Sequence, residues 1–354
     1  MSQTESDIPG EMIRIKLLSR FPAEHWLHQF PHGDGRWGRC EYLFDRNARD
    51  YDWLVVYDDI PPASGEAGKN GSETLACAAS HSILATTEPS SIKIYGNDFT
   101  RQFGAVLTSQ EAWALPHPQR IYTQPALHWF YGVGTGRIIP FDEIESHPPT
   151  AKTSDLSMVF SPKNMRHTLH RQRNEFMRKL MDLLPEMHVF GRGARPLDDK
   201  AEALDNYRYH VAIENYIGLH HWTEKLADSF LGMALPFYCG CPNARDYFPA
   251  ESFIPIDMND PEGAARIIRQ AISDNEYEKR LPAIMEARRR VLYEHNFFAL
   301  ISREIENRHC AGSGNSSHNT IYSRHALRKG NWGVGLRDMY GKVRARAIHL
   351  IRGH

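Results

Sequence analysis

The sequence predicts an α/β protein built from two doubly wound domains. Short apolar runs with strand composition alternate with helical or loop segments in both halves, a pattern typical of parallel sheets covered by helices. A polar segment at 145–155 (ESHPPTAKTSD) separates the halves. With 354 residues, the chain can form two domains of ordinary size. We therefore expect domains at 1–150 and 151–310, followed by a linker and tail at 311–354.

The first half is expected to contain a series of short strands. They are brief apolar runs, which is the pattern of strands buried within a sheet. The expected strands span 53–57, 74–78, 82–86 and 105–108. Proline, glycine and serine are frequent in residues 61–73 (PPASGEAGKNGSE), which predicts a polar loop.

The second half continues the alternation with longer helices. The expected strands are 157–160, a run ending at 189–191, 209–213 and 234–238. The expected helices span 167–184, 224–233 and 261–273, and residues 276–308 form a long charged amphipathic stretch. The polar segment 311–323 (AGSGNSSHNTIYS) is expected to be a linker.

The bulk composition is that of a soluble globular protein. Hydrophobic residues make up 41% and charged residues 24% of the chain, and a net charge of −1 does not suggest nucleic acid as a partner. Five cysteines are too few and too unevenly placed for a disulfide framework. The N-terminus does not resemble a signal peptide, and no apolar run is long enough to span a membrane. These features predict a cytoplasmic protein with free thiols.

The sequence predicts neither a metal site nor an obligatory cofactor. Asp58 and Asp59 follow the strand at 53–57, far in sequence from the second half, and we interpret them as a strand terminus. Two histidine pairs have i,i+3 spacing but lack a third ligand nearby, so they are expected on the surface or in the core. These pairs are His25/His28 and His167/His170.

The segment 210–240 (HVAIENYIGLHHWTEKLADSFLGMALPFYCG) has the outline of a sugar-nucleotide site. An expected strand ends at Glu214 and Asn215, and ligands bind at the carboxyl ends of parallel strands. Thr223 is a good N-cap for a helix that opens with Glu224 and Lys225. A helix N-terminus and a lysine attract phosphate, and a carboxylate can accept hydrogen bonds from sugar hydroxyls. A capped helix of this kind is also common as a purely structural element, and local chemistry leaves that alternative open.

Three sequence strings in this region resemble the family-ten glycosyltransferases, the α-1,3/4-fucosyltransferases. They are Ile213-Glu214-Asn215, Trp222-Thr223-Glu224-Lys225 and Pro236-Phe237-Tyr238-Cys239-Gly240, and the similarity continues through Asn243, Tyr247, Ser252-Phe253-Ile254 and Asp257. The resemblance implies the GT-B fold, in which two Rossmann-like domains face a cleft. The sequence differs from the family pattern at Tyr216, where Ser or Thr is frequent, and at His221, where an aromatic residue is frequent.

The resemblance also implies a set of donor-binding residues. Arg173, in a string Arg173–Phe176 that matches the family's R-N-x-F, and Lys225 would bind the pyrophosphate of GDP, and Glu224 the ribose hydroxyls. The remaining residues of the same pocket would be Glu214, Asn215 and His221. Two protein cations at the pyrophosphate would make a metal ion unnecessary. On residue type alone, Arg171 and Arg178 could take the place of Arg173.

Glu88 is the candidate for the catalytic base. It lies just past an expected strand, in the string 87–92 (TEPSSI), which is similar to a T-G-E-P-P-S-I string of bacterial family members. The string 106–110 (VLTSQ) matches their V-x-T-S-Q. The alternative is an ordinary loop glutamate before proline. Four aromatic residues of the first domain could form a wall on which the acceptor sugar stacks, or they could simply belong to the core. They are Trp113, His128, Trp129 and Tyr131.

The tail after residue 323 is basic and amphipathic. Eight cations face one acid, Asp338, with apolar residues between them. The cations are Arg324, Arg328, Lys329, Arg337, Lys342, Arg344, Arg346 and Arg352. Such a segment fits an anionic membrane surface, and it equally fits a helix that packs across the domains.

Taken with the resemblance, the sequence predicts an inverting, metal-independent glycosyltransferase. It would transfer L-fucose from GDP-fucose to a glycan hydroxyl, in bacterial surface polysaccharide or lipopolysaccharide synthesis, in the cytoplasm at the inner face of the membrane. The alternatives are an enzyme of the same fold with another GDP-sugar donor, and a catalytically idle GDP-sugar-binding protein.

Overall fold

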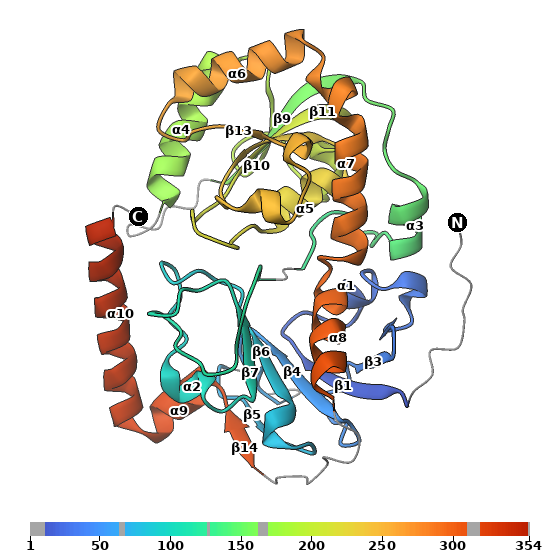
Figure 1. Ribbon diagram of the computed structural model, residues 1–354. Coiled ribbons are helices and arrows are strands. Elements are labelled where there is room, and N and C mark those ends of the chain that lie inside the picture. The colour runs from blue at the N-terminus through green and yellow to red at the C-terminus, as the bar shows by residue number, and fades with distance from the viewer. Residues whose placement is uncertain (1–10, 64–67, 126–127, 162–168, 310–318, 353–354) are drawn as a thin grey trace.

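The computed structural model describes residues 11–63, 68–125, 128–161, 169–309 and 319–352. Two parallel sheets form the centres of two stacked domains (Figure 1). Both sheets are covered by apolar clusters on their two faces, as the alternating sequence pattern predicts. The expected α/β architecture of two doubly wound domains facing a cleft is therefore confirmed.

The first sheet has the strand order β2-β3-β1-β4-β6-β7-β8 and is parallel except where β2 meets β3. Its central strand β4 (WLVVY) is buried at every position, which is why it reads as a continuous apolar run rather than an alternating one. The bounds are β1 Ile13–Leu18, β2 Arg36–Trp37, β3 Cys40–Leu43, β4 Trp53–Tyr57, β6 Ser82–Ala85, β7 Ala105–Thr108 and β8 Arg120–Tyr122. Short helices of this half are α1 Glu24–Leu27, α2 Asn97–Thr100 and α3 Phe141–Ser146.

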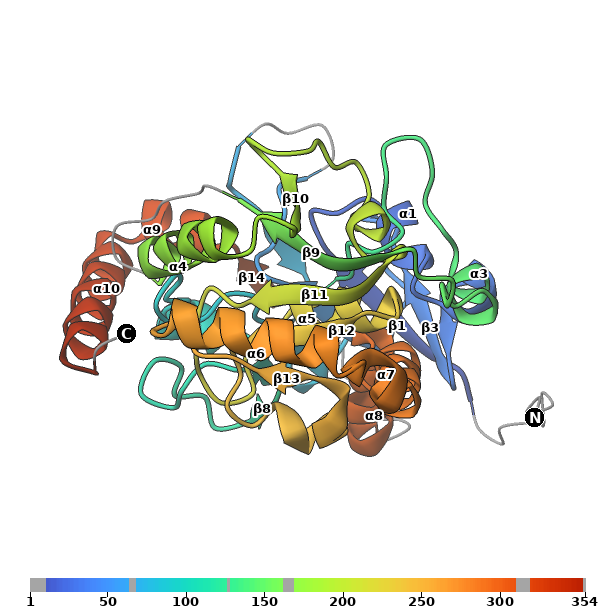
Figure 2. The same cartoon turned by 90° about the horizontal axis from the view of Figure 1, so that it is seen from above.

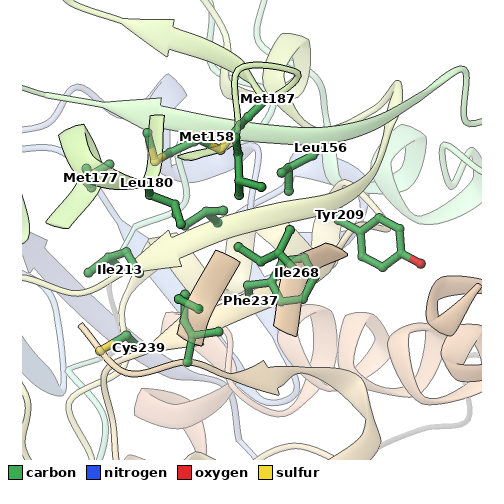
Figure 3. Close-up of a cluster of buried hydrophobic side chains, with 14 of the residues drawn as sticks. Leu156, Met158, Met177, Leu180, Met187, Tyr209, Ile213, Phe237, Cys239 and Ile268 are labelled. Atoms are coloured by element: carbon green, nitrogen blue, oxygen red, sulfur yellow. The ribbon is translucent and has the colours of Figure 1, made fainter. Parts of the chain in front are cut away.

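The second sheet is parallel throughout, in the order β10-β9-β11-β12-β13. Helices α4 and α6 pack on one face, where Met177, Leu180 and Ile268 meet the sheet residues Met158 and Phe237 (Figure 3). Helices α5 and α7 cover the other face. The strands are β9 Ser154–Phe160, β10 His188–Gly191, β11 Tyr207–Ile213, β12 Leu235–Cys239 and β13 Ile254–Pro255. The helices are α4 His170–Leu183, α5 Glu224–Leu231, α6 Pro261–Ser273 and α7 Glu276–Tyr293.

The amphipathic stretch 276–308 is two helices, not one. Helix α7 ends at Tyr293, and Asn296 caps α8 (Phe297–Arg308) by accepting a hydrogen bond from the backbone N–H of Phe298 at 2.8 Å. The apolar face of α8 packs into the cluster beneath the first sheet, together with Trp26 and Tyr57. The chain therefore returns to the first domain before residue 310, earlier than the expected boundary.

The C-terminal segment also belongs with the first domain. Strand β14 (Thr320–Tyr322) pairs antiparallel with β5 (Ser72–Thr74), so part of the expected linker 311–323 is a strand, and β5 lies earlier than the expected strand 74–78. Residues 310–318 lie outside the described residues. Helices α9 (Arg324–Gly330) and α10 (Trp332–Arg352) follow, and Figures 1 and 2 show α10 (red) on the outside of the first domain, on the same side as α4. No helix in the described ranges is long and apolar enough to cross a membrane.

Candidate active site

A cavity of about 490 Å³ lies between the two sheets and is lined from both domains. Strand β4 ends just before Asp58, β6 just before the loop that carries Glu88, and β11 just before Glu214. The carboxyl ends of strands from both sheets therefore meet at one place, where α/β proteins bind ligands. The first domain contributes Arg20, Phe21, Tyr57, Asp58, Thr87, Glu88, Pro89, Ile92, His128 and Phe130. The second contributes Glu214, Asn215, His221, Thr223, Glu224 and Lys225.

Glu214 fixes the start of helix α5. Its side chain is buried, and its two oxygens accept hydrogen bonds from the backbone N–H and the hydroxyl of Thr223, at 2.8 and 2.7 Å. Thr223 is in turn the predicted N-cap, and its hydroxyl oxygen accepts from the backbone N–H of Lys225. Burial raises the pKa of Glu214, although Lys225 and Thr223 oppose this. Glu214 thus orders the loop between β11 and α5, and its hydrogen bonds are made within the protein.

Glu224 and Lys225 form a charged pair at the N-terminus of α5. The Lys225 ammonium lies 2.9 Å from Glu224 and 3.5 Å from Glu214. Burial would lower the pKa of Lys225, but these two carboxylates outweigh it and raise the pKa. For Glu224 burial would raise the pKa, but Lys225 and Lys200 hold it at about 2. Both side chains line the cavity in their charged forms, as a site for hydroxyl and phosphate groups requires.

Arg173 reaches the cavity through Asn215. The guanidinium is buried on α4 and donates hydrogen bonds to the side-chain oxygen of Asn215 and, at 3.1 Å, to the backbone oxygen of Ser161. Asn215 lines the cavity, whereas Arg173 stands behind it. The two competing arginines are on the exposed face of the helix, and Arg171 is paired there with Glu175 at 2.8 Å. Of the three arginines, Arg173 is therefore the one that contacts a cavity-lining residue, Asn215.

His221 connects the two domains. Its Nδ1 lies 2.9 Å from the hydroxyl of Ser109, which belongs to the string 106–110 of the first domain. Burial lowers the pKa of His221 to about 3, so the ring is neutral. Two strings that are far apart in the sequence meet at this contact, next to the cavity that His221 lines.

The loop that carries Glu88 is held by Gln110. The Gln110 amide donates hydrogen bonds to the backbone oxygens of Glu88 and Lys93, at 2.7 and 2.8 Å. Within the described ranges no group hydrogen-bonds to the Glu88 carboxylate, which lines the cavity. Burial raises its pKa, and the negative charges of Asp58 and Glu224 raise it further. This combination of access, unused oxygens and raised pKa is what a general base needs.

Of the first-domain wall of the cavity, the sequence predicts Glu88 and His128 but not the remaining residues. Asp58 does follow the end of β4, as the sequence predicts, but it also lines the cavity beside Glu88. Its position at the end of a parallel strand was the available signal. Asp59 has a structural role, since it accepts a hydrogen bond from the backbone N–H of Arg324 at 3.1 Å.

The expected aromatic wall is mostly wrong. Trp129 and Tyr131 are core residues, and Trp113 packs against His349 of the tail. His128 does line the cavity, stacked on Phe21 with ring centres 4.9 Å apart. The exposed aromatic rings of this wall are instead Phe21 and Phe130. Over the described ranges, no cluster of three or more histidine, cysteine or acidic side chains could hold a metal ion.

The second domain is similar in sequence to known glycosyltransferases. Residues 149–280 match the family model "Glycosyltransferase family 10 (fucosyltransferase) C-term". A stretch of 131 residues is 27% identical to 4-galactosyl-N-acetylglucosaminide 3-alpha-L-fucosyltransferase 9 of Mus musculus and of Homo sapiens. The match spans 35% of this chain and 35% of each relative.

The chain is also similar to solved structures. A crystal structure of an alpha1,3-fucosyltransferase shares 14% identity, with a TM-score of 0.47, over 90% of this chain and 96% of that one. An alpha1,3-fucosyltransferase with GDP-fucose shares 15% identity, with a TM-score of 0.45, over 79% of this chain and 84% of that one. The family match contains all the second-domain residues of the cavity. Residues 149–280 are thus similar in sequence to the C-terminal domain of the family-ten glycosyltransferases.

Proposed function

We propose that the protein is an inverting fucosyltransferase that uses GDP-fucose as donor and a glycan hydroxyl as acceptor. One observation carries the proposal: a single cavity brings the carboxylate of Glu88 from the first domain opposite Glu224, Lys225 and Asn215 of the second. The family of the second domain and the names of the matched relatives support fucose as the transferred sugar.

The donor-binding roles follow from the charges of the second domain. Lys225 and Arg173 are cations near the same loop, and they would stabilise the two phosphates of GDP as the bond to the sugar breaks. Glu224, held ionised by Lys225, would accept hydrogen bonds from ribose hydroxyls. Because the protein supplies these cations itself, we propose that turnover requires no divalent metal.

The chemical step uses Glu88 as base. The acceptor hydroxyl gives its proton to the Glu88 carboxylate while its oxygen forms a bond to the anomeric carbon of fucose. The bond between that carbon and the β-phosphate oxygen breaks, and GDP leaves with the electron pair. Since the acceptor attacks from the face opposite the leaving group, the configuration at the anomeric carbon inverts.

Turnover with a donor panel tests this function. We expect GDP release from GDP-fucose when a glycan acceptor is added, unchanged in EDTA, and much less release from GDP-mannose or UDP-galactose. Preference for another GDP-sugar would favour the same fold with a different donor. GDP-sugar binding without release, with any acceptor offered, would favour an idle binding protein. We propose bacterial surface polysaccharide or lipopolysaccharide precursors as the acceptors to test first.

The tail is proposed to place the enzyme on the inner face of the membrane. The inner side of α10 packs on the first domain, where Arg337 pairs with Asp98 at 2.7 Å and His349 contacts Ser90 at 3.0 Å. Its outer side leaves Trp332 80% and Ile351 85% exposed. A folded helix with a basic, apolar outer face fits an anionic lipid surface.

Variants of the outer face separate membrane binding from stability. Replacing Trp332, Leu350 and Ile351 with serine is expected to abolish salt-sensitive sedimentation with anionic vesicles, because these exposed side chains supply the apolar anchor. Affinity for GDP and the melting temperature should stay at wild-type values. If the tail only clamps the molecule, the wild type will not sediment with vesicles at low salt, and removing 324–354 will lower the melting temperature.

A further inference from the structure

Asp58 is held in an unusual way on the first-domain wall of the cavity. It follows β4 with a φ of 71°, in the left-handed region that few non-glycine residues adopt. Its Oδ1 accepts three hydrogen bonds, from Lys93 Nζ at 2.6 Å, the Tyr95 hydroxyl at 2.6 Å and the Thr87 hydroxyl at 2.9 Å. A residue held against its backbone preference by three donors is firmly positioned.

The same contacts order the loop that presents Glu88. The Tyr95 hydroxyl, which donates to Asp58, also accepts from the backbone N–H of Thr87 at 2.9 Å and of Glu88 at 3.5 Å. Thr87 donates its own hydroxyl to Asp58 as well. Asp58 is therefore tied both to the residue before Glu88 and, through one phenol, to the amide of Glu88 itself.

The second oxygen of Asp58 is available to the cavity. Within the described part of the chain, no group hydrogen-bonds to Oδ2, and the side chain is 32% exposed. Burial opposes ionisation of this carboxyl, but Lys93, Tyr95 and Thr87 outweigh burial and lower its pKa. Because the pKa of Asp58 is lowered and that of Glu88 is raised, Asp58 ionises before Glu88 as the pH increases.

We propose that Asp58 is a positioning residue for Glu88, which orders the loop that presents Glu88 and places a second carboxylate beside it in the cavity. The role of Glu88 as base rests on the proposed function, whereas the effect of Asp58 on Glu88 does not. A fixed negative charge near a carboxylate favours its protonated form. A base with a raised pKa accepts a proton more strongly near neutral pH.

The charges facing Glu88 come from both domains and have both signs. Besides its own burial, Asp58 and Glu224 raise the pKa of Glu88, whereas Lys93 and Lys225 lower it. Asp58 and Lys93 pair with each other, but they have opposite effects on the pKa of Glu88. Neutralising either member alone should move the titration of Glu88, in opposite directions.

Carboxyl NMR of glutamate-labelled protein measures this directly. The Glu88 signal is assigned by its absence in Glu88→Gln. In Asp58→Asn, which keeps an acceptor oxygen and tolerates the left-handed backbone, we expect Glu88 to titrate at lower pH than in the wild type. In Lys93→Gln it should titrate at higher pH. The matched control is Asp59→Asn, a neighbouring carboxyl outside the cavity, which should leave the titration unmoved.

The outcomes separate this inference from the proposed function. The role of Asp58 would be overturned if the pKa of Glu88 shifted no more in Asp58→Asn than in the Asp59→Asn control. It would also be overturned if the pKa shifted in the same direction in the Asp58 and Lys93 variants. In either case Asp58 would only stabilise the local structure. If the opposite shifts occur but no GDP-sugar turns over, the inference stands and the proposed function fails. If a GDP-sugar does turn over, kcat/KM should fall off at a lower pH in Asp58→Asn than in the wild type.

Discussion

Replacing Glu88 with glutamine is expected to reduce turnover by about 10²–10⁴-fold while leaving the affinity for GDP unchanged. Glutamine preserves the size of the side chain but cannot accept the acceptor's proton. The backbone oxygen of residue 88 still accepts from Gln110, so the loop should keep its position. Steady-state kinetics at saturating acceptor and calorimetry with GDP measure the two quantities.

The pH profile gives a second signature of the base. Only the ionised carboxylate accepts a proton, and burial, with Asp58 and Glu224, raises the pKa of Glu88 above the ordinary glutamate value. Wild-type activity should therefore rise with pH through that raised pKa and be lost below it.

The control for Glu88→Gln is the variant Glu24→Gln, at an exposed glutamate of the same domain, which should behave as wild type. A Glu88→Gln enzyme with near wild-type turnover would exclude Glu88 as the base.

Loss of any one of Arg173, Glu224 and Lys225 is expected to weaken GDP binding by about 10–100-fold. Each alanine variant removes one charge-assisted hydrogen bond, worth about 1.5–3 kcal/mol. Calorimetry with GDP measures the change, and melting curves show whether each variant is folded. This check matters most for Lys225→Ala, because it leaves Glu214 and Glu224 without their common partner.

The surface arginine of the same helix provides the matched control. Arg171 is exposed and paired with Glu175, so Arg171→Ala should bind GDP as the wild type does. Three folded variants of the donor set with unchanged GDP affinity would contradict the assignment of this pocket. If Arg171→Ala lost as much GDP affinity as Arg173→Ala, GDP binding would depend on the overall positive charge of the helix and not on a specific contact of Arg173.

Local rules of the sequence were enough to predict the strand and the helix that form the second-domain wall. The N-cap rule placed Thr223 before α5, and the structure confirms this start. A strand that ends at Ile213 brings Glu214 and Asn215 to the sheet edge. Glu88 lies more than a hundred residues earlier, and no spacing rule joins it to α5. Family resemblance, not periodicity, brought the two together.

The features that were missed depend on contacts between distant segments. The left-handed backbone of Asp58 and its link to Lys93 cannot be read from two adjacent aspartates. Helix α8 has an amphipathic pattern that does not say which sheet it covers. In the segment 128–131, the cavity-lining and core residues alternate, and residue type alone does not fix which of them faces the cavity.

A crystal structure of the protein with GDP bound would show whether the cavity between the two sheets is the donor site. We expect GDP in the cavity between the two sheets, with its phosphates against Lys225 and Arg173, its ribose on Glu224 and its terminal phosphate directed toward the side of Glu88. GDP bound elsewhere, or bound in this cavity without contact to Glu224 or Lys225, would contradict it.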